Sequence, residues 1–104
     1  MSIGGKKPRA ERRLEERAAR KLVRDRERLF ELSPGGSATR PIEVTSAAVI
    51  EVRVAALPCA QCGGEYRTRD HVSAGPGLRR VDVTCRQCSA PRSLWFRIVS
   101  DEPN

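Results

Sequence analysis

The sequence is poor in aromatic residues and contains no long apolar run. Aromatic side chains make up 4% of the 104 residues, so the core must be small and little room is left for a deep substrate pocket. We therefore expect neither an enzyme nor a small-molecule substrate. No stretch is apolar enough to form the core of a secretory signal, which predicts a reducing compartment, the cytoplasm.

Histidine occurs once, and the carboxylates of the C-terminal half alternate with arginines. His71 is expected on an exposed strand, and Glu65, Asp70 and Asp82 are expected to pair with cations on neighbouring strands. The sequence has neither a nucleophile motif nor a glycine loop that could hold a phosphate, because residues 75–77 are typical of a turn. No catalytic residue is predicted.

Positive charge is concentrated in the N-terminal third. The chain carries a net charge of +7, of which residues 1–40 contribute +6 through twelve cations and six anions. Such an imbalance indicates a polyanionic partner for this segment, DNA or RNA. Only three of the cations are lysines, however, and a preference for arginine also follows from a GC-rich genome.

One long helix is predicted over residues 9–32, which lack glycine and proline and are rich in arginine, glutamate, leucine and alanine. Pro8 suits a helix start, and the segment 1–8 is expected to be disordered. At about 100° per residue, one narrow side of the helix is apolar. This leucine stripe consists of Leu14, Ala18, Leu22, Leu29 and Leu32. The arginine stripe, on another side, consists of Arg13, Arg17, Arg20, Arg24 and Arg28.

Three interpretations of this helix stay open. It could be a solvated, salt-bridged helix without a partner, a helix that binds nucleic acid through the arginine stripe, or a surface for self-association or protein docking through the leucine stripe. Asp25 interrupts the leucine stripe, so a coiled coil is not predicted. Apart from Phe30 at its margin the apolar face has no aromatic residue, so membrane binding is not expected.

The rest of the chain divides into a linker, a β domain and a tail. Residues 33–41 are rich in proline, glycine and serine and form the predicted linker. Residues 42–99 contain the segments predicted to form β-strands and make up the β domain, and residues 100–104 form a short tail. The predicted fold class is a small antiparallel β domain of three or four strands with a separate N-terminal helix.

Alternating side chains place the strands of this domain. Residues 48–57 are expected to form a half-buried strand with Ile50, Val52 and Val54 on one face. A polar strand over residues 65–72 and its return over residues 78–84 form a predicted hairpin. The last strand is expected over residues 93–99, where Leu94, Phe96 and Ile98 share a face.

Two cysteine pairs frame the hairpin, and each has the spacing C-x2-C. The pairs are Cys59 with Cys62 and Cys85 with Cys88, and 22 residues separate them. A Zn²⁺ ion binds four thiolates at the corners of a tetrahedron, and each C-x2-C turn supplies two of them. Because the hairpin returns the chain, both pairs meet at neighbouring strand ends. We therefore predict one structural zinc ion, which would stabilise a domain too small to rely on its core.

Two other uses of the four cysteines stay open. They could form two disulfides, or one pair could be a thioredoxin-like redox motif. A reducing compartment is unfavourable for disulfides, and the flanking sequence lacks the βαβ pattern of a thioredoxin motif.

The segment from Leu57 to Val99 resembles a zinc ribbon, the module in which two cysteine knuckles lie on an antiparallel β-sheet. The resemblance rests on the sequences CAQCGG and CRQCSA, the hairpin between them and the aromatic strand that follows. It implies that the metal ligands are Cys59, Cys62, Cys85 and Cys88. Zinc ribbons occur in transcription, translation and replication proteins and also as plain scaffolds, so the resemblance implies a binding or scaffolding module rather than one role.

The residues that follow the two knuckles differ. Gly63 is expected to adopt the positive φ that lets backbone N–H groups point at sulfur. Ser89 stands at the position where the second knuckle often has glycine. The gap of 22 residues between the pairs is also longer than the roughly 15 to 20 residues that are usual for this motif. Both are departures from the ribbon pattern, and neither removes a ligand.

The arginines and aromatic residues of the β domain can be interpreted in two ways. They could form a nucleic-acid surface in which guanidinium groups meet phosphates and a ring stacks on a base. They could instead offset the negative charge of a zinc–thiolate centre and pair with carboxylates. The residues are Arg67, Arg69, Arg79, Arg80, Arg86, Arg92, Arg97, Tyr66 and Trp95.

The leading hypothesis for function is a non-enzymatic zinc module associated with nucleic acid through the basic helix. The alternative is an adaptor that binds another protein through the leucine stripe or the exposed edge of the sheet.

Overall fold

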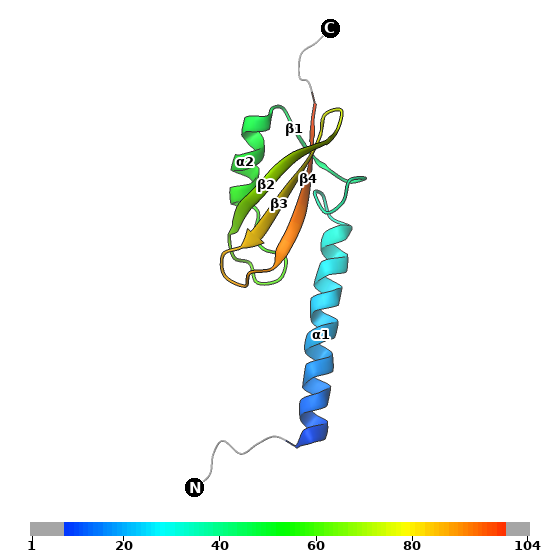
Figure 1. Ribbon diagram of the computed structural model, residues 1–104. Coiled ribbons are helices and arrows are strands. Elements are labelled where there is room, and N and C mark those ends of the chain that lie inside the picture. Colours follow the sequence, from blue (N-terminus) through cyan, green and yellow to red (C-terminus); the bar gives the residue numbers. More distant parts are fainter. Residues whose placement is uncertain (1–7, 100–104) are drawn as a thin grey trace.

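The computed structural model describes residues 8–99, which form a long helix and a small β domain (Figure 1). The helices are α1 (Arg9–Glu31) and α2 (Ala47–Ala56). The strands are β1 (Ile42–Val44), β2 (Tyr66–Gly75), β3 (Leu78–Cys85) and β4 (Pro91–Ile98). Residues 1–7 and 100–104 lie outside the described residues, and with them most of the segment predicted to be disordered and the predicted tail.

The four strands form one sheet in the order β1-β4-β3-β2. Strands β2, β3 and β4 pair antiparallel, and the short β1 pairs parallel with the end of β4. The hairpin predicted between the two cysteine pairs is confirmed as β2 and β3, joined by a turn in which Gly77 adopts a φ of 70°. The fold is therefore a small, mostly antiparallel β domain with a separate N-terminal helix, as the sequence predicts.

The core is formed by alternate side chains of the central strands together with α2. Because side chains alternate along a strand, one face of β3 and β4 is buried. Ile50 and Val54 of α2 join the same cluster, four residues apart on one side of the helix. The strand residues of the cluster that are no more than 1% exposed are Val81, Val83, Cys85, Leu94 and Phe96.

The prediction of a strand over residues 48–57 is wrong, because Ala47–Ala56 form the helix α2. Alternation placed Ile50, Val52 and Val54 on one face, but the structure buries the first and third and leaves the second 68% exposed. Four alanines in the segment favour a helix. In a short apolar segment the two-residue period of a strand and the 3.6-residue period of a helix are hard to tell apart, and packing against the sheet decides between them.

The predicted helix over residues 9–32 is confirmed by α1 to within one residue. None of its residues is buried, and only Phe30 packs against the core cluster. No Cα atom of α1 lies within 8 Å of one in another helix or strand, and the helix projects away from the sheet (Figure 1). Neither helix within residues 8–99 has the length and apolar character that crossing a bilayer requires.

The segment after α1 is held against the edge of β4. The backbone N–H of Trp95 donates to the carbonyl of Gly35 (2.9 Å), and the N–H of Gly35 donates to the carbonyl of Arg40 (2.6 Å). Gly35 has a φ of 87°, and a Cβ atom there would lie 2.8 Å from the side chain of Ile42. Only glycine fits this tight turn beside the sheet.

Truncation of two neighbouring apolar residues tests the helical assignment of α2. Ile50→Ala is expected to lower the free energy of unfolding by about 2 to 4 kcal/mol, because it removes a fully buried side chain. Val52→Ala should change it by less than about 0.5 kcal/mol, because Val52 faces solvent. Chemical denaturation measures both, and equal losses would mean that the two residues share a buried face, as in a strand.

Candidate metal centre

The sheet brings the four cysteines to one place. The first knuckle lies between α2 and β2, and the second lies between β3 and β4. All four Sγ atoms lie within 4.8 Å of one another. The Sγ atoms of Cys62 and Cys85 are 3.4 Å apart, and those of Cys59 and Cys88 are 3.7 Å apart. Four sulfurs about 2.3 Å from a central ion would be about 3.8 Å apart, so the cluster is consistent with a tetrahedral C4 zinc site.

Disulfides do not account for this cluster. The sulfurs of a disulfide are about 2.05 Å apart, and all four cysteines here are free thiols. Neither C-x2-C pair is therefore closed on itself as in an oxidised redox motif. The arrangement favours metal binding over the two other uses of the cysteines.

Backbone pairing continues past the strands and places the knuckles side by side. Tyr66 lies opposite Cys85 in the ladder of β2 and β3. Beyond it, the N–H of Arg86 donates to the carbonyl of Glu65 (2.8 Å), and the N–H of Cys59 donates to the carbonyl of Gly64 (2.7 Å). The hairpin is thus the physical reason that Cys62 and Cys85, which are 23 positions apart, meet.

Backbone N–H groups surround the sulfurs. Those of Gln61 and Gly64 donate to the sulfurs of Cys59 and Cys62, each at 3.4 Å. In the second knuckle the N–H groups of Gln87 and Cys88 both donate to Cys85, at 3.3 Å and 3.4 Å. Such bonds stabilise thiolate over thiol and orient the ligand, as expected around a bound metal.

Ionisation of the four thiols is unequal. The N–H groups of Cys88 and Gln87 lower the pKa of Cys85 to about 6, against opposing desolvation. Burial opposes ionisation of Cys59, but backbone N–H groups of Cys62 and Gln61 outweigh it and lower the pKa. The N–H of Ala90 favours the Cys88 thiolate, yet desolvation and the neighbouring sulfurs raise its pKa to about 12. Neighbouring thiolates repel one another, and a metal cation that replaces the thiol protons offsets this repulsion. The four sulfurs therefore suit a thiophilic metal ion.

The cluster offers a closed set of four ligands. No histidine, aspartate or glutamate joins the four cysteines within the described residues, and His71 lies instead in β2. Cys59 and Cys85 are buried, whereas Cys62 and Cys88 reach the surface. Four thiolates with no open position are typical of a structural rather than a catalytic zinc site.

The predicted positive φ of Gly63 is confirmed at 77°. Ser89 holds the same place after the second knuckle, and it adopts a φ of 62° although it is not glycine. Its N–H donates to the carbonyl of Cys85 (3.1 Å), which closes the turn. The departure from the ribbon pattern is therefore one of residue type and not of backbone shape.

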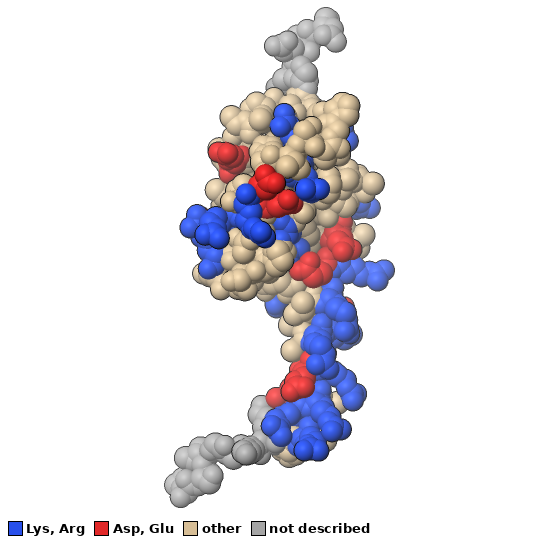
Figure 2. Space-filling model, viewed as in Figure 1, with Lys and Arg blue, Asp and Glu red and all other residues tan. Residues whose placement is uncertain are grey.

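The arginine stripe lies along α1, away from the cysteines. Its five members are exposed, and Figure 2 shows cations covering much of the helix surface. Within residues 8–99, no carboxylate lies within ion-pair distance of Arg13, Arg17 or Arg20. On the neighbouring side Lys21 donates to Asp25 (2.7 Å) and lowers the pKa of that carboxyl, with smaller contributions from Arg24 and Arg28. The stripe thus keeps unpaired positive charge.

Several predicted contact residues of the β domain have structural roles instead. Arg92 is buried and forms two hydrogen bonds with Glu27 of α1. Tyr66 is 3% exposed, and its hydroxyl accepts a hydrogen bond from the N–H of Ala60 (3.0 Å). Neither can serve as an exposed contact for nucleic acid. The sequence carried no local signal for the pair of Arg92 and Glu27, because 65 residues separate them.

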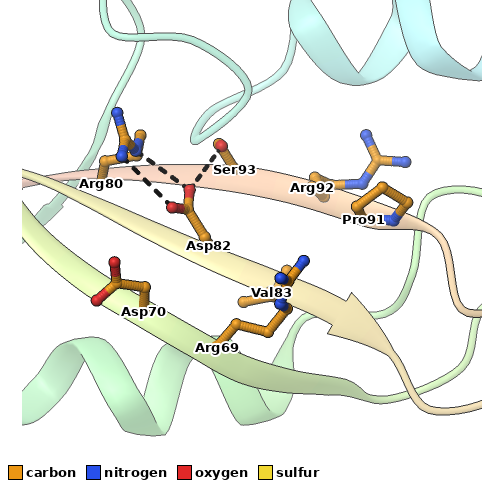
Figure 3. Close-up of a pocket in the computed structure, with 8 residues that line it drawn as sticks. All are labelled: Arg69, Asp70, Arg80, Asp82, Val83, Pro91, Arg92 and Ser93. Carbon is orange, nitrogen blue, oxygen red and sulfur yellow. Dashed lines mark hydrogen bonds and ion pairs between the residues drawn. The ribbon is translucent and has the colours of Figure 1, made fainter.

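A hollow on the sheet is lined by charged residues of β2, β3 and β4 (Figure 3). Asp82 accepts hydrogen bonds from Arg80 (3.1 Å) on its own strand and from the hydroxyl of Ser93 (2.8 Å) on β4. Arg69 and Asp70 of β2 lie across from this group. The cross-strand pairing predicted for Asp82 is made with a hydroxyl rather than with a cation.

Comparison with protein-family models, curated proteins and solved structures finds no match to this chain. The assignment of the site therefore depends on the cysteine cluster and its surroundings.

Replacement of Ser89 tests the turn of the second knuckle. Ser89→Gly is expected to raise the free energy of unfolding by about 1 kcal/mol, because a φ of 62° is costly for a residue with a Cβ atom. For a domain of this size, that corresponds to a rise of about 4 to 8 °C in Tm. The matched change Gly63→Ala should lower Tm by a similar amount. A Tm that falls on Ser89→Gly would contradict this account.

Proposed function

We propose that this chain is a non-enzymatic zinc ribbon module. Cys59, Cys62, Cys85 and Cys88 would hold one Zn²⁺ ion, which supplies a cross-link between the knuckles and no reactive position. The support for this proposal is the tetrahedral spacing of four free thiols, the N–H groups directed at sulfur and the absence of a fifth ligand among the described residues. Zinc is preferred because a tetrahedral site of four thiolates suits it better than harder cations.

Metal analysis of the purified protein tests the zinc site. We expect one zinc per chain, and four titratable thiols after a chelator removes it. Loss of the metal should also unfold the β domain, because a small domain draws folding energy from its structural zinc. Cys85→Ser should abolish binding, whereas His71→Ala should leave one zinc per chain. Material without zinc, or with zinc retained by Cys85→Ser, would refute the site.

The arginine stripe supports a role in binding nucleic acid. The observation that carries this proposal is a projecting helix on which Arg13, Arg17 and Arg20 have no carboxylate partner within residues 8–99. From Arg13 to Arg28 the stripe extends about 22 Å along the helix axis, a length that spans several phosphates. The zinc ribbon would act as the rigid base of this helix.

The aromatic residues favour contacts with phosphates over contacts with bases. Phe96 and Tyr66 are buried, and the Phe30 ring packs against the guanidinium of Arg92 at 4.2 Å. Trp95 is half-buried in β4. Proteins that bind single strands use exposed rings as stacking platforms, which this surface offers poorly. The expected binding is therefore electrostatic and independent of sequence.

Salt dependence tests this role. We expect a labelled duplex to bind the zinc-loaded protein at about 50 mM salt and to lose roughly 100-fold in affinity by about 200 mM, because each phosphate contact releases counterions. The double variant Arg17→Glu, Arg24→Glu should weaken binding at least tenfold and flatten the salt slope. Fluorescence anisotropy measures both. No binding of either DNA or RNA at about 50 mM salt would refute the role.

A second candidate function is that of an adaptor for another protein, and one observation favours it. The leucine stripe does not contribute to the core, and Leu14, Leu22 and Leu29 are 61%, 49% and 67% exposed. Leu22→Glu separates the two functions. It should abolish partner capture or self-association if the leucine stripe is the binding surface, and it should leave nucleic-acid binding nearly unchanged if the arginine stripe is.

A further inference from the structure

The first knuckle contacts α1 directly through Gln61. This residue lies between Cys59 and Cys62, and its N–H donates to the sulfur of Cys59 (3.4 Å). Its side-chain Nε2 donates to the carbonyl of Val23 (3.0 Å) and to Oε1 of Glu27 (2.7 Å), both on α1. One residue therefore joins a sulfur of the metal centre to the helix.

Two further contacts complete the docking site of α1. The side chain of Arg26 donates to the carbonyl of Gln61 (2.7 Å). Arg92 of β4 donates through both Nη atoms to the carboxylate of Glu27, and its guanidinium lies over the Phe30 ring. Only 4% of the Arg92 side chain is exposed, so the loss of Glu27 would leave a buried charge unpaired.

These contacts use a face of α1 that neither stripe occupies. At about 100° per residue, Val23, Arg26, Glu27 and Phe30 fall within about 100° of one another. The arginine and leucine stripes lie on the two remaining sides of the helix. Docking through this third face thus determines the direction in which both stripes point.

The other contacts of the helix lie at its C-terminal end, where Arg40 donates to the carbonyl of Leu32 (2.9 Å) and the following turn bonds to β4. No Cα atom of α1 lies within 8 Å of one in another helix or strand, and Phe30 is its only residue packed against the core cluster. Along the helix itself the connection is made by hydrogen bonds at the knuckle and at Arg92. Their geometry depends on the positions of Cys59 and Cys62, because Gln61 is fixed between them.

We propose that α1 docks in this orientation only when the first knuckle holds metal, so that Zn²⁺ sets the direction of a helix that supplies no ligand. Gln61 and Arg92 are the positioning residues. This inference rests on the proposed zinc site and is independent of what α1 binds. Metal removal would release the helix from the domain even where α1 itself stays helical.

Hydrogen exchange of the full chain tests the proposal. In the zinc-loaded protein, Gln61→Ala is expected to speed exchange of the amides of residues 23–32 about tenfold, because the docked turns lose their hydrogen bonds. Amides of β2 and β3 should keep their protection, and zinc content should stay at one per chain. The matched control is Gln87→Ala, at the equivalent position of the second knuckle, which bonds to no atom of α1 among the described contacts.

Zinc content measured on the same samples separates the possible failures. If the wild-type chain holds no zinc, the proposed site and the docking inference are both overturned. If it holds one zinc and Gln61→Ala leaves exchange in residues 23–32 unchanged, only the docking inference is overturned. Equal effects of Gln61→Ala and Gln87→Ala would also overturn it, because they would indicate general loosening of the knuckles.

Discussion

The meeting of four cysteine sulfurs at the end of the β2–β3 hairpin is the constraint on which the rest of the structure depends. Cys59 and Cys85 belong to the cluster of eleven buried residues, so the proposed metal centre continues the core. A domain of this size buries too little apolar surface to be stable by burial alone. The proposed metal cross-link between distant segments would supply the missing stabilisation, and in the proposed docking it would also fix the place where the helix is held.

Electrostatics divide the cations of this chain into two groups with different roles. Arg92 is buried, and its hydrogen bonds lower the pKa of Glu27 despite partial burial of the carboxyl. That pair is ionised at neutral pH and is part of the fold. Arg13, Arg17 and Arg20 face solvent without a carboxylate partner in residues 8–99, so their charge is available to a ligand. The number of cations in the sequence therefore exceeds the number of positive side chains that are available to bind a ligand.

Local patterns in the sequence predicted the parts of the fold that depend on local physics. The uninterrupted helical segment, the two C-x2-C turns and the hairpin between them carry their signals within a few residues of one another. The α2 helix was not predicted because Ile50, Val52 and Val54 alternate as in a strand, although Ile50 and Val54 also share one face of a helix, and packing against the sheet decides between the two. The parallel pairing of β1 was missed because a three-residue strand has no pattern of its own.

The contacts that hold α1 could not be predicted for a different reason. Gln61 lies 34 residues from Glu27, and Arg92 lies 65 residues from it. A polar residue between two cysteines has no property that distinguishes it from a solvated one until the fold places a partner opposite. The knuckle residues Gln61 and Gln87 illustrate this, because they occupy equivalent positions in the sequence but only Gln61 forms hydrogen bonds with α1.

The docked end of α1 also bears on how its free end stays helical. A helix must first order a costly turn, after which each added residue is nearly neutral or slightly favourable. The contacts at Val23, Arg26 and Glu27 hold such a turn near the C-terminal end of α1. Residues 9–22 can then extend from it, although none of their Cα atoms lies within 8 Å of one in another helix or strand and about 14 residues alone are marginal in water. If the first knuckle holds the proposed zinc ion, the projecting basic surface depends on the same constraint that holds the two cysteine pairs together.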